Sequence, residues 1–209
     1  MLEVSIKTVV YVDGQNFLYK IAERVVASGL ATSKQEVSAI DIPYLLHQVF
    51  PDEQLEIRYY GVAKIRQQRK YGEEIAEKSV QFADNLRRMR NCLAKTGVEF
   101  RATGVLKVRD RDECKKCGTT DYKFQEKGVD VGLAVDVVAD SLKGWVDHIV
   151  LLSSDTDLAP ALKVAKEASK RITYVGFDNQ LTRLLSSLAD STQIIRDNEV
   201  IEAYRRMCD

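Results

Sequence analysis

The feature that most constrains the fold is a short aliphatic run that leads directly into two acidic residues. Residues 149–152 are all aliphatic, and the polar stretch after them holds Asp155 and Asp157, followed by Pro160. A short apolar run bounded by turn residues is typical of a buried parallel strand, and proline fits the first turn of the next helix. Because ligands of open α/β sheets bind at the carboxyl ends of strands, the two acids lie where a site is expected.

A second apolar run points to the same edge of the sheet. It covers 8–12 and ends in Asp13, while Asp130 stands near the start of a predicted helix. If the two strands are parallel neighbours, Asp13, Asp130, Asp155 and Asp157 gather at one place. Crowded carboxylates repel each other unless a cation neutralises them, and oxygen ligands with few histidines select Mg²⁺ or Mn²⁺. Taken alone, Asp130, Asp155 and Asp157 also fit ordinary helix caps or first-turn acids, and Asp13 fits a tight turn in which Gly14 lets the backbone turn sharply, so the metal-site prediction depends on their grouping.

The rest of the chain alternates between predicted strands and predicted helices. Strands are predicted at 8–13, 55–60, 98–108, 148–153, 172–175 and 192–195. Helices are predicted at 17–28, with Asn16 as the cap, and at 41–50, 68–96, 128–142, 157–169, 180–188 and 197–207. This alternation, with apolar strands, predicts an α/β fold with a mostly parallel central sheet.

Size and charge narrow the class of protein further. The chain has 209 residues, enough for one sizeable domain, so a single domain over 1–209 is predicted. Its 31 basic and 31 acidic side chains cancel, so any nucleic-acid-binding surface must be local. The sequence has neither an apolar run long enough to cross a membrane nor a secretory leader, which predicts a cytoplasmic protein. Four cysteines are too few for a disulfide scaffold.

An irregular, charged insertion is predicted at about 109–126, and it carries Cys114 and Cys117. A Cys-x-x-Cys pair followed by glycine is half of a Zn²⁺ site. The missing ligands would come from a distant residue or from the same pair in the second subunit of a homodimer. Two free thiols in a surface loop explain the pair as well, and a redox pair or disulfide is the third alternative.

Three motifs occur in a fixed order along the chain: 12–16 (VDGQN), 127–136 (KGVDVGLAVD) and 153–158 (SSDTDL). Together they resemble the NYN domain of the PIN-like nuclease superfamily, and most of all its LabA-like branch, over about residues 8–195. The resemblance implies a three-layer α/β/α PIN-like sandwich and a metal-dependent ribonuclease. It also implies site residues, namely the acids Asp13, Asp130, Asp155 and Asp157, the polar helper Asn16, and a further family acid at Asp136. Asp130 and Asp136 are six positions apart, so they face different sides of one helix and are not expected to touch the same ion directly.

The first functional hypothesis is therefore hydrolysis of RNA phosphodiester bonds, with Mg²⁺ or Mn²⁺ held by the acids. Basic side chains beside an acidic metal centre suit an RNA backbone, and the candidates for phosphate contact are Arg109, Lys115, Lys116 and Lys127. The alternative is an RNA-binding regulatory scaffold that kept the acids but cleaves weakly. A phosphotransfer or receiver-like domain is disfavoured, because the second acid that such phosphatases place two residues after the first is Gln15 here.

Overall fold

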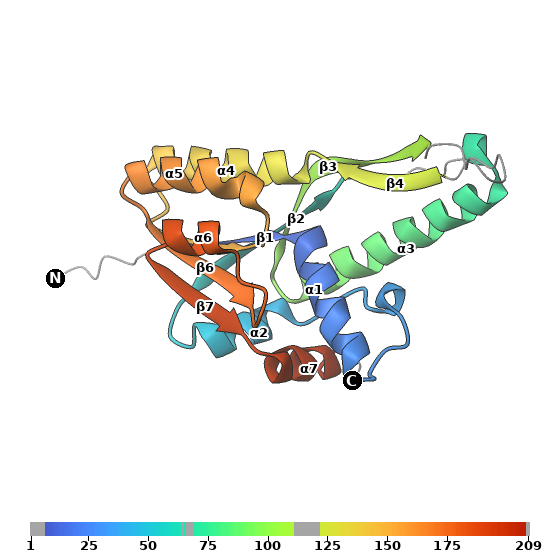
Figure 1. Ribbon diagram of the computed structural model, residues 1–209, viewed down its shortest axis with the longest axis horizontal. Helices are drawn as coiled ribbons and strands as arrows, with labels where there is room; N and C mark the ends of the chain where they lie inside the picture. Colours follow the sequence, from blue (N-terminus) through green and yellow to red (C-terminus); the bar gives the residue numbers. More distant parts are fainter. Residues whose placement is uncertain (1–6, 64, 66–68, 111–121, 208–209) are drawn as a thin grey trace.

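The protein is built around one twisted sheet of seven strands (Figure 1). The computed structural model describes residues 7–63, 65, 69–110 and 122–207. In the order in which they lie side by side, the strands are β4 (Tyr122–Lys127), β3 (Glu99–Asp110), β2 (Leu55–Val62), β1 (Thr8–Asp13), β5 (His148–Leu152), β6 (Arg171–Phe177) and β7 (Ser191–Ile195). All neighbours are parallel except β3 and β4, which form an antiparallel pair.

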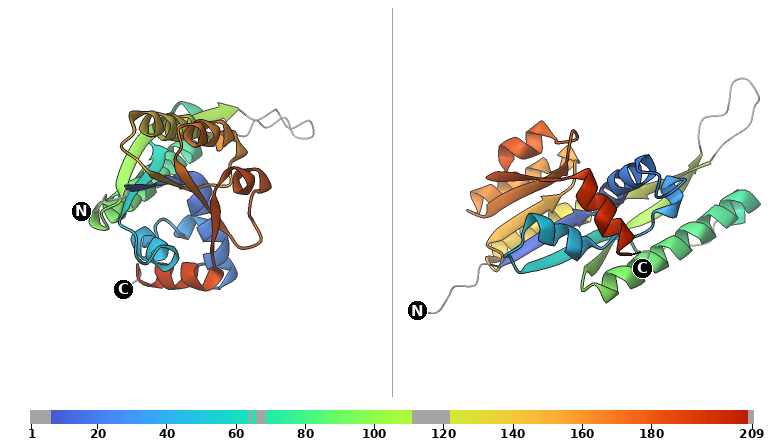
Figure 2. Two further views of the ribbon diagram at one scale, coloured as in Figure 1. Left: turned by 90° about the vertical axis from the view of Figure 1, so that its left-hand side faces the viewer. Right: turned by 90° about the horizontal axis from the view of Figure 1, so that it is seen from below.

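Helices cover both faces of this sheet, so the predicted three-layer α/β/α architecture with a mostly parallel sheet is confirmed. One face carries α1 (Gly14–Ala27), α2 (Ile42–Val49), α7 (Asp197–Arg205) and the C-terminal half of α3 (Glu73–Lys95). The other carries α4 (Val129–Lys143), α5 (Ala159–Glu167) and α6 (Arg183–Leu188). Figure 2 shows the yellow and orange helices α4 and α5 across the sheet from blue α1 and red α7.

The central strands are apolar throughout because both of their sides are buried. On β1, Val10 and Val12 pack into the core beneath α1 and α2, whereas Val9 and Tyr11 pack into the core beneath α4 and α5. No helix within the described ranges is long and apolar enough to cross a bilayer. That the chain forms a single domain over 1–209 stays a prediction.

The predicted irregular insertion at 109–126 is wrong at both of its ends. β3 continues to Asp110, and the chain returns as β4 from Tyr122. The reason is visible in the alternation of side chains. The ring of Phe124 lies 5.0 Å from that of Phe82 on α3, and the ring of Tyr122 lies 5.1 Å from that of Tyr71, in the 3-10 turn before α3. The residues between the two strands, with Cys114, Cys117, Lys115 and Lys116, lie outside the described residues. The Zn²⁺ site, the homodimer that would share it and the cytoplasmic location stay predictions.

Three predicted helices begin later than expected. A 3-10 turn at Arg69–Tyr71 precedes α3, because Gly72 adopts a φ of 95° that only glycine accepts readily. A second 3-10 turn, Thr156–Leu158, precedes α5, and Pro160 falls in the first turn of α5 as predicted. The last of the three, α6, starts at Arg183 rather than at residue 180.

A polar network surrounds the buried side chain of His148 on β5, at the amino end of the sheet. This imidazole is 1% exposed, with Nε2 2.8 Å from Thr173 Oγ1 and Nδ1 2.6 Å from an Arg171 guanidinium nitrogen and 3.1 Å from Glu53 Oε2. Burial first, and then the Arg171 charge, hold the pKa of His148 below its ordinary value of 6.5, although Glu53 acts in the opposite direction.

This network predicts a pH-dependent loss of stability. As the pH falls below about 6.5, the unfolded chain gains a proton at residue 148 that the folded chain resists, so the free energy of unfolding decreases. In His148→Gln this contribution is absent, and the stability of the variant should fall less steeply over the same window. Urea unfolding of both proteins at several pH values between 5.5 and 7.5 measures the two slopes. Parallel slopes would show that His148 titrates alike in the folded and unfolded chains.

Candidate active site

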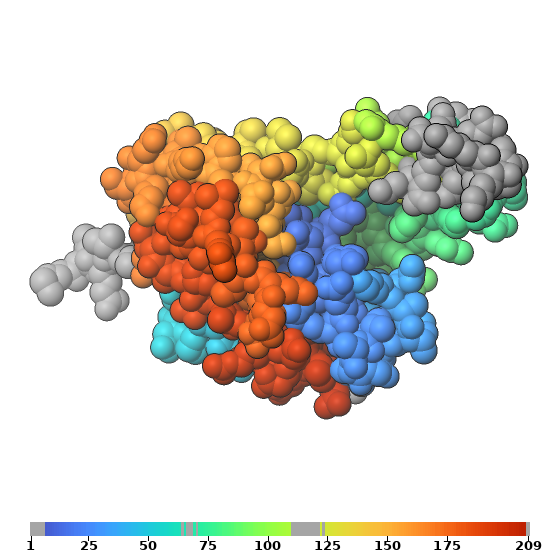
Figure 3. All heavy atoms as spheres, viewed as in Figure 1, coloured from blue at the N-terminus to red at the C-terminus, as the bar shows by residue number. Residues whose placement is uncertain are grey.

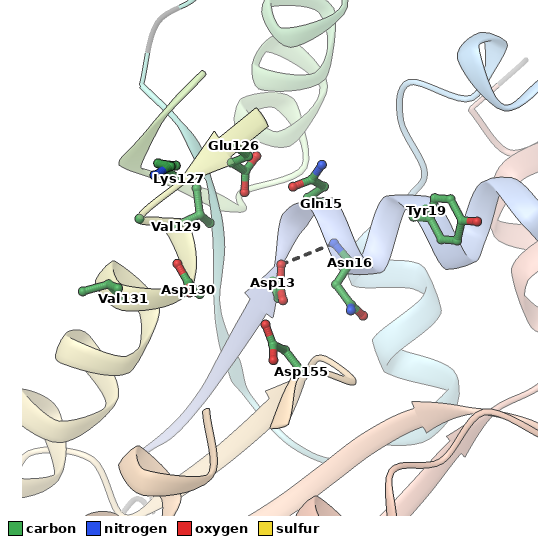
Figure 4. Close-up of a pocket in the computed structure, with 11 residues that line it drawn as sticks. Asp13, Gln15, Asn16, Tyr19, Glu126, Lys127, Val129, Asp130, Val131 and Asp155 are labelled. Atoms are coloured by element: carbon green, nitrogen blue, oxygen red, sulfur yellow. Dashed lines mark hydrogen bonds between the residues drawn. The ribbon is translucent and has the colours of Figure 1, made fainter. Parts of the chain in front are cut away.

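Four carboxylates line one cavity of about 590 Å³ at the carboxyl end of β1 (Figure 4). They come from four separate segments, and they are Asp13 at the end of β1, Glu126 on β4, Asp130 in the first turn of α4 and Asp155 after β5. In the close-up, Asp13, Asp130 and Asp155 lie around one space, with Glu126 beside it. The chain runs outward from β1 to β4 on one side and from β5 to β7 on the other. The cavity therefore lies at the topological switch point, where open α/β sheets bind their ligands.

Asp13 is the most enclosed of the four carboxylates, with 7% exposure. Its Oδ2 accepts a hydrogen bond from Ser153 Oγ at 2.8 Å, and its Oδ1 accepts one from the backbone N–H of Asn16 at 3.3 Å. Burial raises the pKa of Asp13, the two hydrogen bonds oppose that rise, and the charges of Asp155 and Asp130 add to it. The two hydrogen bonds thus fix the position of the Asp13 carboxylate, while the charges of Asp155 and Asp130 disfavour its ionised form.

The cap of α1 is Asp13, not Asn16 as predicted. Because α1 begins at Gly14, Asn16 lies within the first helical turn. Its side chain contacts Ser154 instead of capping the helix. Asn16 Nδ2 donates to Ser154 Oγ at 3.0 Å, and Asn16 Oδ1 accepts from the Ser154 backbone N–H at 3.2 Å. Together with the Ser153–Asp13 bond, these contacts tie the start of α1 to the turn after β5.

Close packing at Gly14 brings α1 onto the neighbouring strand β2. Tyr59 donates its hydroxyl to Gly14 O at 2.8 Å. A Cβ at residue 14 would lie 2.2 Å from Tyr59 Cε1 and 2.3 Å from the Tyr60 carbonyl oxygen, so any larger residue would collide. Glycine here therefore reflects the close approach of two segments, in addition to the sharp turn that the sequence predicted.

Glu126 is the site residue that sequence reasoning missed. Burial raises its pKa to about 7, and the charges of Asp13 and Asp130 act in the same direction. The signal was the alternation of Tyr122, Phe124 and Glu126, which places Glu126 on the inner face of β4. Once that stretch is taken as irregular, the signal is lost.

Two of the predicted acids lie outside the cavity lining. Asp157 is exposed, and its backbone N–H donates to Asp155 Oδ1 at 2.9 Å. Asp136 accepts a hydrogen bond from Tyr60 Oη at 2.9 Å, on another side of α4 from Asp130. Lys127 does line the cavity, at its mouth, whereas Arg109 lies farther out on β3.

The donors present fit a hard divalent cation. The four candidate ligands are all carboxylates, the groups that Mg²⁺ and Mn²⁺ prefer. Burial first, and then their mutual repulsion, raise the pKa values of Asp13 and Glu126, and a bound cation would favour the ionised form of both. Within the part of the chain that the structure describes, no three acidic, histidine or cysteine side chains already converge closely enough to hold an ion together.

Comparison with known proteins agrees with this architecture. A protein of Pseudomonas putida (strain DSM 28022 / S16), named 6-hydroxy-3-succinoylpyridine 3-monooxygenase HspA, is 26% identical over 177 residues, which cover 77% of this chain and 56% of that protein. The match thus spans little more than half of that protein's length. The crystal structure of VPA0982 of Vibrio parahaemolyticus RIMD 2210633, a protein of unknown function, shares the fold, with a TM-score of 0.55, 18% identity, and coverage of 93% of this chain and 96% of that chain.

A domain family also matches nearly all of the sequence. The family model of the NYN domain matches residues 7–196, which include every strand and all four carboxylates of the cavity. The chain therefore belongs to the NYN domain family.

Proposed function

We propose that this protein is a metal-dependent ribonuclease that hydrolyses RNA phosphodiester bonds, from the LabA-like branch of the NYN family. The observation that carries the proposal is the convergence of four carboxylates, from four segments of an NYN fold, on one open cavity at the sheet's switch point. Carboxylates this close together repel each other and lower the stability of the fold unless a bound cation neutralises them. Groups perturbed in this way are typical of functional sites.

Asp13, Asp130 and Asp155 are the proposed ligands of Mg²⁺ or Mn²⁺. When bound, the cation supplies Lewis acidity, which lowers the pKa of water and neutralises charge on a phosphate group. Ser153 orients the Asp13 carboxylate through its 2.8 Å hydrogen bond, and the Asp157 backbone N–H does the same for Asp155. Glu126, whose pKa burial and the charges of Asp13 and Asp130 raise to about 7, is the fourth carboxylate of the cavity and lies beside the proposed ligands.

The outer face of the β3–β4 hairpin is the proposed RNA-binding surface. The register pairs Val105 with Lys127 and Lys107 with Gln125, and Arg109 follows two residues after Lys107, so these residues share the face opposite α3. Successive positions on this face are about 6.8 Å apart, two residues of an antiparallel strand. Lys107, Arg109 and Lys127 are exposed and form no ion pair with another described residue. Figure 3 shows the hairpin in yellow-green leading toward the junction of α1 and α4.

Charge reversal on this face should lower the affinity for RNA and make that affinity less dependent on salt. In Lys107→Glu/Arg109→Glu, two phosphate contacts are lost, so the slope of log affinity against log salt should become shallower by about 1.4 for a single strand. Fluorescence anisotropy of a labelled oligoribonucleotide over a salt series measures both quantities. The matched control is Lys143→Glu/Lys163→Glu, the same charge change on exposed residues of α4 and α5. Equal slopes for the two double variants would remove the hairpin from the binding surface.

A cleavage assay tests the proposed function. The purified chain is incubated with RNA in Mn²⁺, in Mg²⁺ and with chelator, and we expect products only with metal. RNA binding without turnover would favour the regulatory scaffold instead. A parallel incubation with 6-hydroxy-3-succinoylpyridine, an electron donor and air tests the activity in the name of the Pseudomonas relative. Consumption of that compound without RNA cleavage would overturn the proposal.

A further inference from the structure

An exposed aromatic ring stands at the end of the acidic cavity away from the hairpin. Tyr19 lines the same cavity as the four carboxylates, yet its side chain is 53% exposed. It lies one helical turn after Asn16 on α1, and side chains three residues apart on a helix are neighbours. Figure 4 shows Tyr19 on α1 beyond Asn16, on the opposite side of Asp13 from Lys127.

The ring of Tyr19 is fixed from one side by a cation. Lys34 Nζ lies 3.8 Å from the ring centroid, and the same ammonium pairs with Glu23 Oε1 at 2.9 Å. Lys34 belongs to the 3-10 turn Lys34–Glu36, which packs beside α1. An aromatic ring held in this way loses little conformational freedom when a ligand packs on its remaining exposed surface.

Three other tyrosines, Tyr59, Tyr60 and Tyr71, pack elsewhere in the structure. Tyr59 and Tyr60 are 3% and 0% exposed within the two cores, and the ring of Tyr71 packs on Tyr122. Among the residues that line the cavity, Tyr19 supplies the aromatic ring. The cavity volume of about 590 Å³ falls within the range of about 300–1,000 Å³ typical of small-ligand sites, so the cavity as a whole is large enough for a ligand the size of a nucleotide.

We propose that Tyr19 stacks on an unpaired nucleobase next to the phosphodiester bond that the carboxylates hold, so that the substrate is RNA that is single-stranded at the cleavage site. This inference rests on the proposed function and deepens it. Bases in a duplex have both faces covered by their neighbours, whereas single-stranded segments can turn a base onto an aromatic side chain. The phosphates would then follow Lys127 and the hairpin face in one direction, and the base would lie on α1 in the other.

An abasic scan tests the stacking contact directly. Binding is measured by anisotropy in the Asp13→Asn background, which prevents turnover and keeps a residue that caps helices equally well. The probe is a single-stranded oligoribonucleotide of mixed sequence in which one base at a time is removed. One abasic position should lower the affinity of the Tyr19 protein by about tenfold. Tyr19→Leu should bind the intact strand about tenfold more weakly and should be insensitive to that position, because the same contact is already lost.

Two further variants separate stacking from a structural role. Tyr19→Phe keeps the ring and should retain the abasic sensitivity. Lys34→Met breaks the Lys34–Glu23 pair but leaves the ring, and it should retain most of the affinity. If Lys34→Met reproduces the loss seen in Tyr19→Leu, the ring serves the local fold and the inference is overturned. A duplex of the same sequence should bind both Tyr19 forms alike.

Failure of this inference is distinguishable from failure of the proposed function. If the wild-type chain neither binds nor cleaves RNA, both are overturned. If cleavage occurs and depends on Asp13, but the Tyr19→Leu protein keeps full affinity and the same abasic profile, only the stacking role is overturned.

Discussion

Asp13→Asn is expected to abolish metal-dependent RNA cleavage while the chain stays folded. Loss of a residue that merely supports a metal ligand costs about 10–100-fold, so loss of a carboxylate in the centre of the cavity should cost at least about 100-fold. Asparagine still caps α1. Because one of several mutually repelling charges is gone, the metal-free variant should melt at or above the wild-type temperature, and metal should stabilise it less.

The measurement is turnover of RNA at saturating Mn²⁺, paired with thermal unfolding with and without metal. Asp155→Asn should behave in the same way, since Asp155 lines the same cavity. Asp52→Asn is the matched control, an exposed aspartate next to β2 near the opposite edge of the sheet. Wild-type turnover by Asp13→Asn at saturating Mn²⁺ would exclude the proposed chemistry, whatever the metal affinity proves to be.

Gly14→Ala is expected to destabilise the fold itself. The added methyl group would lie 2.3 Å from the carbonyl oxygen of Tyr60, a backbone atom of β2 that cannot turn aside as a side chain can. Overpacking in a dense core typically costs about 1–3 kcal/mol, and a collision with backbone should reach the upper end of that range or exceed it. The start of α1, which carries Asn16 and Tyr19, would shift with it.

Urea unfolding followed by circular dichroism measures this cost. Gly14→Ala/Tyr59→Leu distinguishes the two collisions, because leucine removes the ring atom at 2.2 Å and leaves the carbonyl oxygen in place. We expect the double variant to regain little stability. A Gly14→Ala chain within about 0.5 kcal/mol of wild type, the range of ordinary surface substitutions, would mean that α1 and β2 can separate freely at this point.

The sequence was sufficient for the parts of the site that follow from a single strand. Asp13 and Asp155 each come directly after a buried apolar run, so the strand-end rule places both at one edge. Glu126 could not be placed in this way, because its position depends on the antiparallel pairing of β3 with β4, which the long-range contact of Phe124 with Phe82 supports. Tyr19 resembles any exposed helical tyrosine until the fold brings α1 beside the acids.

Spacing along the chain also does not show which of two nearby acids lines the cavity. Asp155 and Asp157 are two residues apart on one turn, and the sequence treats them alike, yet Asp155 lines the cavity and Asp157 is exposed outside it. The difference arises because the Asp155 side chain caps the 3-10 turn. Such caps depend on backbone angles that tertiary packing sets.

The bond between Ser153 and Asp13 joins residues 140 positions apart, across the neighbouring strands β1 and β5. Closing a loop of that length costs entropy before the contact forms, so such pairings form slowly compared with local ones. A chain still being synthesised, or cut before β5, holds Asp13 but lacks both Ser153 and Asp155. Unfinished and truncated copies therefore lack the assembled carboxylate cluster, so the proposed activity can appear only after the chain has been made through β5 and the turn that follows it.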